Sequence, residues 1–321
     1  MKLGLTFLTG RPHSCSWLTT YRCNYRCMFC RSWERFEHGR ELTVDEFARA
    51  ARKLAQVGAM VVNFGGGEPF LRPDFADIVH VVSRYHLCWV SSNGSLITRE
   101  RAREIIDAGI WGVGVSIDYA DADRHDAQRG VKGAHDRAVN ALKVLSEERA
   151  GRVPLIKVMT ILMHDNLDDL PKLATLAREY GADFLVQPYS VLKTGDEQFV
   201  HRGRVARKLL RLKAAFPNLT SNPVFLERFD TAITKGVNNC TAGRYLFSIG
   251  PEGGVAECDE RTTHPVGSIL TDDVGMLVRR LRARHRVNTC RLCWYNCRGE
   301  LEAFHTFRGM LHSLATNLRI G

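Results

Sequence analysis

The sequence predicts an α/β protein built on a parallel sheet, with a small α+β domain at its carboxyl end. Over the first 190 residues, short apolar runs alternate six times with longer amphipathic stretches, as in parallel strands joined by right-handed helical crossovers. After residue 190 the alternation stops, and most of the ten cysteines fall into two groups. Six units are too few for an eight-stranded barrel, so an open partial barrel or a doubly wound sheet remains.

The repeated units predict the following elements in chain order. Strands are expected at 16–21, 59–64, 87–91, 110–117, 155–163 and 184–187. Helices are expected from residue 43 onward and at 73–85, 98–108, 133–149 and 167–180. The first helix is clearly marked, because Thr43 and Glu46 form a capping box ahead of an apolar face.

The pattern changes near residue 190. Residues 193–239 are basic and rich in loops around one expected helix at 205–215. A hairpin is expected from 244–249 and 255–258, followed by helices at 273–285 and 300–317. We therefore divide the chain into a core at 1–190, a connecting segment at 191–235 and a carboxyl-terminal domain at 236–321.

Composition restricts the class of protein. The 321 residues are 45% hydrophobic and 25% charged, which excludes disordered, collagen-like and disulfide-miniprotein classes. No apolar run approaches 18 residues, so no membrane span is expected. Segment 1–10 is a poor signal peptide, because Thr6 and Thr9 interrupt it. We expect a cytoplasmic protein, whose clustered cysteines bind metal or act in catalysis.

The net charge of +10 is compatible with an acidic peptide, a phosphorylated substrate or nucleic acid. The basic residues are dispersed, and no compact basic block interleaves with aromatic residues. This distribution argues against nucleic acid as a partner.

Cys23, Cys27 and Cys30 form a Cys-x3-Cys-x2-Cys pattern directly after the first expected strand. Three thiolates on one loop can hold three corners of an iron–sulfur cube, and they leave the fourth iron open for a ligand. Zinc is the alternative metal, but the loop offers it only three thiolates at unequal spacing.

This loop resembles the cluster-binding loop of the radical S-adenosylmethionine (SAM) enzymes. The resemblance implies a partial (β/α)6 TIM-like barrel and a [4Fe–4S] cluster at Cys23, Cys27 and Cys30, with SAM on the open iron and Phe29 near its adenine. It also implies reductive cleavage of SAM to a 5′-deoxyadenosyl radical, which abstracts a hydrogen atom from the substrate. A reductant such as flavodoxin or ferredoxin would supply the electron.

Gly66, Gly67 and Glu68 resemble the Gly-Gly-Glu-Pro motif of the same family. The resemblance implies that their backbone and carboxylate meet the SAM ammonium. Glycine allows close backbone approach, and a carboxylate suits an ammonium group. A glycine turn before a helix is the ordinary alternative.

Four more residues match weaker motifs of the family. Asn93 lies in a Ser-Asn-Gly sequence, and Ser116 and Asp118 lie in a Ser-Ile-Asp sequence. The resemblance places both sequences near the ribose or methionine part of SAM, and it places Arg129 near the SAM carboxylate. Polar residues at strand ends are also ordinary turn chemistry.

The second group of cysteines resembles the SPASM domain of radical SAM enzymes, or its shorter twitch form. The matching pattern is Cys240-x12-Gly253-x4-Cys258, followed by Cys290-x2-Cys293. A full SPASM domain has seven cysteines and two auxiliary clusters, whereas five are present here. We expect one auxiliary [4Fe–4S] cluster, with Cys240, Cys258, Cys290 and Cys293 as the favoured ligands. Cys297 replaces one of them or stays free, and a structural zinc ribbon is the alternative.

The short tail favours the twitch-type small-molecule enzymes. We therefore expect an oxidoreductase that uses the auxiliary cluster in dehydrogenation, or an epimerase, acting on a small metabolite. The alternative is a peptide or protein maturase that forms a cross-link, an epimer or formylglycine. Only about 15 residues precede the first strand, so no fused leader-peptide recognition domain is expected.

An epimerase needs a hydrogen donor, for which Cys15, Cys88 and Cys297 are the candidate residues. Cys88 lies in an apolar strand, where a core role is the ordinary alternative. A zinc- or nucleic-acid-binding protein without catalysis is the hypothesis from another class.

Overall fold

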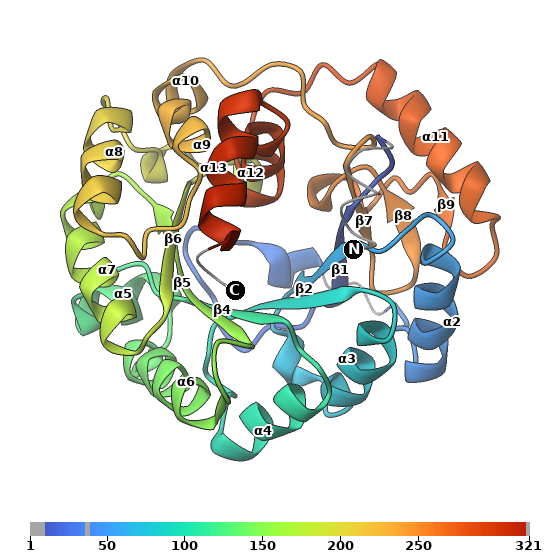
Figure 1. The fold of residues 1–321 in the computed structure, drawn as a ribbon, viewed down its shortest axis with the longest axis horizontal. Coiled ribbons are helices and arrows are strands. Elements are labelled where there is room, and N and C mark those ends of the chain that lie inside the picture. Colours follow the sequence, from blue (N-terminus) through green and yellow to red (C-terminus); the bar gives the residue numbers. More distant parts are fainter. Residues whose placement is uncertain (1–9, 36–38, 319–321) are drawn as a thin grey trace.

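The computed structural model describes residues 10–35 and 39–318. Segment 1–9, most of the stretch interpreted as a poor signal peptide, lies outside the described residues. In the part described, nine strands form a single sheet in the order β6-β5-β4-β3-β2-β1-β7-β8-β9 (Figure 1). Across the same residues, no helix combines the length and the apolar character needed to cross a bilayer.

The first six strands confirm the predicted partial barrel. They are β1 (Ser14–Thr20), β2 (Val61–Gly66), β3 (Leu87–Ser92), β4 (Gly112–Ser116), β5 (Leu155–Leu162) and β6 (Asp183–Pro188). Each pairs in parallel with its neighbours in chain order. The carboxyl ends of these strands therefore meet at one edge, where the first cysteine loop lies.

Helices form the outer layer of the barrel (Figure 1). They are α2 (Val44–Leu54), α3 (Phe75–Ser83), α4 (Arg99–Asp107), α5 (Ala122–Arg129), α6 (Ala134–Glu148) and α7 (Leu170–Glu179). The capping box of α2 is present, and the helix buries Phe47, Ala51 and Leu54 against the sheet. Short 3₁₀ helices lie in the connections: η1 (Ser32–Arg35), η2 (Pro69–Leu71), η3 (Leu167–Asp169), η4 (Val191–Lys193), η5 (Glu197–Phe199) and η6 (Asp259–Arg261).

Helix α5 was not predicted from the sequence. It is short and mostly polar, so it lacks the apolar periodicity that marks the other helices. Its start is capped by the Asp121 side chain, which accepts a hydrogen bond from Arg124 N, and it ends at Gly130 in the left-handed conformation.

Glycines in β4 make room for large side chains of the neighbouring strands. A Cβ at Gly112 would lie 2.2 Å from the Trp89 ring, and a Cβ at Gly114 would lie 2.1 Å from Met159 Sδ. Large side chains from β3 and β5 therefore fill the space beside β4 in the barrel.

The remaining elements follow β6. They are α8 (Ala206–Ala215), α9 (Pro223–Glu227), α10 (Phe229–Thr234), β7 (Leu246–Ile249), β8 (Gly254–Ala256), β9 (Gly267–Ser268), α11 (Val274–Arg286), α12 (Asn296–Phe304) and α13 (Phe307–Leu318). The expected hairpin is confirmed as β7 and β8, and β9 extends it by a third strand. Strand β7 pairs in parallel with β1, so the sheet continues from the barrel into the carboxyl-terminal domain. The division of the chain at 191–235 stays a prediction.

The single helix expected at 300–317 is wrong, because two helices occupy this stretch. Between them, Thr306 Oγ1 accepts a hydrogen bond from Gly309 N at 3.1 Å, as a helix-capping side chain does. A Cβ at Gly309 would lie 1.9 Å from Ala303 O, so the glycine permits the close turn.

Candidate active site

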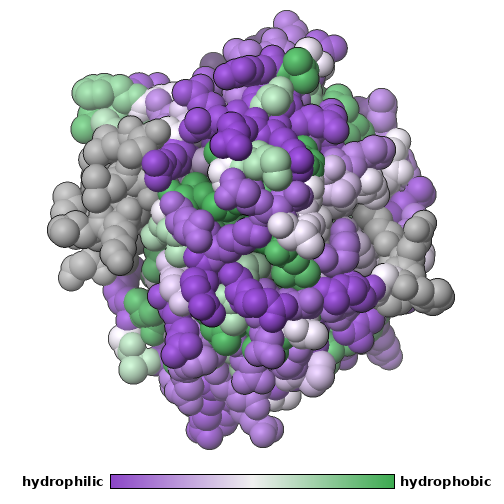
Figure 2. Space-filling view, turned by 90° about the vertical axis from the view of Figure 1, so that its right-hand side faces the viewer, coloured by the Kyte–Doolittle hydropathy of each residue, from purple (hydrophilic) through white to green (hydrophobic). Residues whose placement is uncertain are grey.

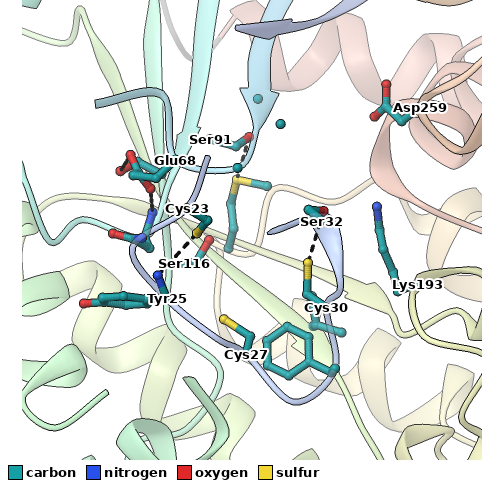
Figure 3. Close-up of a pocket in the computed structure, with 18 of the residues that line it drawn as sticks. Cys23, Tyr25, Cys27, Cys30, Ser32, Glu68, Ser91, Ser116, Lys193 and Asp259 are labelled. Atoms are coloured by element: carbon teal, nitrogen blue, oxygen red, sulfur yellow. Dashed lines mark hydrogen bonds between the residues drawn. The ribbon is translucent and has the colours of Figure 1, made fainter. Parts of the chain in front are cut away.

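The three cysteines of the first motif lie on one loop directly after β1. The loop is held by its own backbone, because Cys30 N donates to Cys27 O at 3.1 Å. It is also held by the barrel, because Met28 N donates to Gln128 O in α5 at 2.9 Å. Figure 3 shows the three thiols on this loop, with Glu68 on one side and Lys193 and Asp259 on the other.

The loop lines a cavity of about 280 Å³ at the carboxyl ends of the strands. Of the sequence-predicted residues, the following line it: Cys23, Cys27, Cys30, Phe29, Gly66, Gly67, Glu68, Asn93, Ser116, Arg129 and Cys297. The structure thus brings together segments that are more than 250 residues apart in the chain.

The glycines at the end of β2 let this strand approach the cysteine loop closely. A Cβ at Gly66 would lie 2.1 Å from Thr20 O, and one at Gly67 would lie 1.9 Å from Arg22 O. Gly67 N donates to Thr20 O, and Glu68 N donates to Arg22 O, each at 2.8 Å. A Cβ at Gly65, by contrast, would have no heavy atom within 4 Å. The β2 edge therefore leaves open space beside the three thiols, which fits a bound cofactor.

Glu68 joins the ends of β2 and β3. Its carboxylate accepts hydrogen bonds from Ser92 Oγ at 2.9 Å, Asn93 N at 2.8 Å and Phe70 N at 3.2 Å. Burial raises the pKa of Glu68 to about 7, although these hydrogen bonds act in the opposite direction.

Asn93 connects the end of β3 to the cysteine loop. Its Nδ2 donates to Asn24 Oδ1 at 2.9 Å, and Asn24 Nδ2 donates to Ser95 Oγ at 2.8 Å. Asn93 Oδ1 accepts a hydrogen bond from Ser95 N at 2.9 Å. Asn93 therefore orients the loop as well as lining the cavity.

Arg129 places a positive charge beside the thiols. Its Nη1 lies 4.0 Å from Cys27 Sγ, and its guanidinium lies over the Phe29 ring at 5.2 Å. Burial raises the pKa of Cys27 to about 12, and Arg129 opposes this effect. Arg129 Nε is buried without a hydrogen-bond partner. A buried orphan donor beside open space is consistent with an anionic group binding there.

Asp118 does not line the cavity and acts behind Arg129. Its Oδ2 accepts from Arg129 Nη2 at 2.5 Å, and its Oδ1 accepts from Ile161 N at 2.9 Å. Its side chain is fully buried. The carboxylate thus compensates the buried guanidinium and fixes its position.

All five cysteines of the second group line another cavity, of about 150 Å³. Cys240 precedes β7, Cys258 follows β8, Cys290 and Cys293 lie between α11 and α12, and Cys297 is the second residue of α12. Among residues 10–35 and 39–318, no three His, Cys, Asp or Glu side chains converge as they would around one metal ion. The five thiols instead surround a space, which fits a larger group.

The buried Arg298 side chain connects the segments that carry these cysteines. Its Nη1 donates to Cys293 O at 2.9 Å, and its Nη2 donates to Val237 O at 2.6 Å and Asn238 O at 3.0 Å. Its Nε donates to Glu302 Oε1 at 2.8 Å. One guanidinium therefore holds the segment before Cys240 against the loop of Cys293.

The two cavities share part of their walls. Asn63, Asp259, Tyr295 and Cys297 line both. Of the three candidate hydrogen donors, Cys297 lies at the first cavity, whereas Cys15 and Cys88 are fully buried in the hydrophobic core.

Sequence reasoning missed several residues of the first cavity. The most informative are Asn63, Gln187, Lys193, Tyr295 and Asn296. Asn63 and Gln187 could have been found as polar residues inside otherwise apolar strands, and Tyr295 and Asn296 could have been found between two motif cysteines. Lys193 has no such signal, because it reaches the cavity from the loop-rich segment after β6.

Comparison with known proteins agrees with this arrangement. The family model described as the radical SAM superfamily matches residues 17–177. Mycofactocin maturase MftC of Mycolicibacterium smegmatis is 30% identical over 318 residues, covering 93% of this chain and 80% of that protein. PqqA peptide cyclase of Bradyrhizobium diazoefficiens is 28% identical over 304 residues, covering 90% of this chain and 73% of that protein.

Solved structures share the fold. SuiB of Streptococcus suis, bound to precursor peptide SuiA, aligns with a TM-score of 0.64 and 18% identity over 83% of this chain and 64% of that one. This chain therefore spans a little under two thirds of SuiB. The anSMEcpe structure with bound AdoMet and a peptide aligns with a TM-score of 0.66 and 15% identity over 95% of this chain and 99% of that one.

The chain belongs to the radical SAM superfamily and has a carboxyl-terminal auxiliary domain of the SPASM or twitch type. Membership of this superfamily implies a [4Fe–4S] cluster and SAM.

Proposed function

We propose that this radical SAM enzyme is a maturase that modifies a precursor peptide. The observation that most supports this proposal is the first cavity, in which the three-cysteine loop of the barrel faces residues of the carboxyl-terminal domain. Relatives that align over at least nine tenths of the chain are named as a maturase and a peptide cyclase. Together these findings favour a peptide over the small metabolite expected from the short tail.

Cys23, Cys27 and Cys30 would hold the cluster, and the open β2 edge would admit SAM. When bound, this pair supplies one-electron cleavage of the sulfonium and abstraction of a substrate hydrogen atom. Arg129 offsets negative charge beside Cys27, and Glu68 fixes the strand ends. The second group of thiols would hold one auxiliary cluster. Four cysteines saturate a [4Fe–4S] cube, so one of the five is in excess.

The wall of the cavity opposite the barrel fits a peptide unit. Asn296 is the first residue of α12, and its backbone N–H donates to Gln187 Oε1 at the end of β6 at 3.1 Å. Both polar atoms of the Asn296 carboxamide are buried without a partner. A carboxamide can donate to a peptide carbonyl and accept from a peptide N–H, so a bound main chain would satisfy both atoms.

The test begins with anaerobic reconstitution and analysis of iron and sulfide. About eight irons per chain are expected for two cubes. Zinc without acid-labile sulfide would contradict the proposal and would support the non-catalytic alternative. The reduced protein is then incubated with SAM, and 5′-deoxyadenosine is quantified.

Short peptides encoded beside the gene are then offered as substrates. A loss of two mass units from a peptide indicates oxidation, and deuterium uptake from solvent indicates epimerisation. Asn296→Ala should weaken peptide modification while leaving substrate-independent 5′-deoxyadenosine formation intact. Turnover of a small metabolite, with every peptide unchanged, would overturn the proposal.

A further inference from the structure

A basic surface lies directly beside the auxiliary cysteines. Helix α11 carries exposed arginines, and the loop after it exposes Val287 at 75% and Leu292 at 51%. We call this surface the arginine-rich patch, which comprises Arg279, Arg282, Arg284, Arg286, Val287, Arg291 and Leu292. Helix α11 lies at the outer edge of the molecule (Figure 1), and Figure 2 faces that side, which is predominantly hydrophilic.

The positive charge of the patch is largely uncompensated. Arg280 of the same helix pairs with Asp272 at 3.4 Å, and Arg282 donates to the Gly10 carbonyl at 3.3 Å. Within the described part of the chain, Arg284 and Arg286 form no ion pair with an acidic side chain. Their charges are therefore available to an acidic partner.

The patch reaches the auxiliary site but not the first cavity. Helix α11 ends at Arg286, and Cys290 and Cys293 follow in the next seven residues. Leu292 and both cysteines line the second cavity, and no residue of the patch is among those that line the first. A partner bound here would contact the loop that carries two auxiliary cysteines, and it would lie away from the site of substrate chemistry.

We propose that the arginine-rich patch docks an acidic electron-transfer protein of the flavodoxin or ferredoxin kind. Val287 and Leu292 are exposed apolar side chains that follow or adjoin exposed arginines in the chain, so the surface combines apolar and basic groups, as transient protein interfaces do. The basic groups would speed association with an acidic partner and make it sensitive to salt. The inference rests on the proposed function only in that a radical SAM enzyme needs an external electron donor.

The test measures binding and uses a purified bacterial flavodoxin as the probe. We expect the double variant Arg284→Glu/Arg286→Glu of the reconstituted enzyme to weaken flavodoxin binding about tenfold or more at low salt. The matched control is Arg207→Glu/Arg211→Glu in α8, on the opposite side of the molecule (Figure 1). The control should change the dissociation constant less than about twofold, because its charges lie far from the patch.

Two further measurements keep the result interpretable. Reduction of the clusters by dithionite should be the same in the parent and both variants, whereas reduction by flavodoxin should be slower in the patch variant alone. Leu292→Ser should weaken flavodoxin binding without changing its salt dependence.

Equal weakening by the patch and control variants, or parental affinity of the patch variant, would overturn the proposal. Loss of affinity for an acidic peptide with unchanged affinity for flavodoxin would also overturn it, because the patch would then recognise substrate. All of these outcomes are independent of whether any peptide is modified.

Discussion

The first cysteine loop and the second group of cysteines hold their thiols in different ways. The loop at 23–30 places three thiols on eight consecutive residues, beside an open strand edge. The second group gathers five thiols from three separate segments around a smaller cavity. The first site therefore depends on local backbone geometry and on close contact with β2. The second depends on long-range contacts such as those of Arg298.

The largest expected difference between the two sites is the loss of SAM cleavage when one thiol is removed from each. Cys27→Ala should lower 5′-deoxyadenosine formation on the order of a hundredfold or more, because it removes a ligand from the catalytic group. Cys240→Ala should leave substrate-independent cleavage within about threefold, because its site is separate. Cys27→Ala should retain about four of eight irons, because its loop has no spare thiol. Equal loss of SAM cleavage in both variants would show that the two sites are not functionally distinct.

The next effect concerns how the second site is assembled. Arg298→Lys keeps the charge but loses several hydrogen bonds between buried segments, and it should lower the free energy of unfolding by about 3 kcal/mol. The control Arg308→Lys alters an exposed pair with Glu227 and should cost less than about 1 kcal/mol. Urea denaturation of both variants measures the difference. Similar costs would contradict the role given to Arg298.

A smaller effect concerns the approach of β2 to the first loop. Gly67→Ala should lower the free energy of unfolding by about 2 kcal/mol, because its Cβ would collide with Arg22 O. Gly65→Ala adds a methyl group in open space and should change the free energy of unfolding by less than about 0.5 kcal/mol. Urea midpoints provide the comparison, and equal midpoints would show that β2 is free to shift.

The last effect is a pH dependence of the free energy of unfolding. Because the pKa of Glu68 is raised to about 7, the folded state keeps a proton that the unfolded chain loses near pH 4.5. The stabilisation that protonated Glu68 gives the folded state is fully present below about pH 4.5, and it is lost as the pH rises toward about 7. Glu300, in the middle of α12, should behave in the same way, because burial raises its pKa to about 7.

Glu68→Gln should therefore reduce the fall in stability between pH 5 and 7, and Glu300→Gln should remove a separate part of it. The check is the free energy of unfolding measured at several pH values. An unchanged slope in Glu68→Gln would mean that this carboxyl is already ionised at pH 5.

The barrel and the first site were largely predictable because their signals are local. Apolar periodicity located the six strands, and the spacing of Cys23, Cys27 and Cys30 located the loop. Helix α5 escaped prediction because its polar composition gives no periodic signal, yet it positions Arg129. The place of Asp118 behind Arg129 and the approach of Lys193 to the first cavity were also hidden, because both depend on how separate segments of the chain pack together.

In the second site, the sequence indicated the cysteines but not how they are brought together. The hydrogen bonds of Arg298 with Val237 and Asn238 join segments about 60 residues apart, and no sequence pattern predicts such contacts. The break before α13 was missed for a related reason. It depends on the fit of Gly309 against Ala303 rather than on a proline or a polar run.

Strand β1 is paired on both edges, with β2 on one side and β7 on the other. A chain truncated at residue 235 would therefore leave one edge of β1 unpaired. The exposed backbone amides and carbonyls of that edge could pair with another chain, so the truncated protein should aggregate. A chimera that swaps carboxyl-terminal domains between relatives would face the same problem. Its crossover point should precede β7, so that the transplanted piece brings its own partner for the first strand.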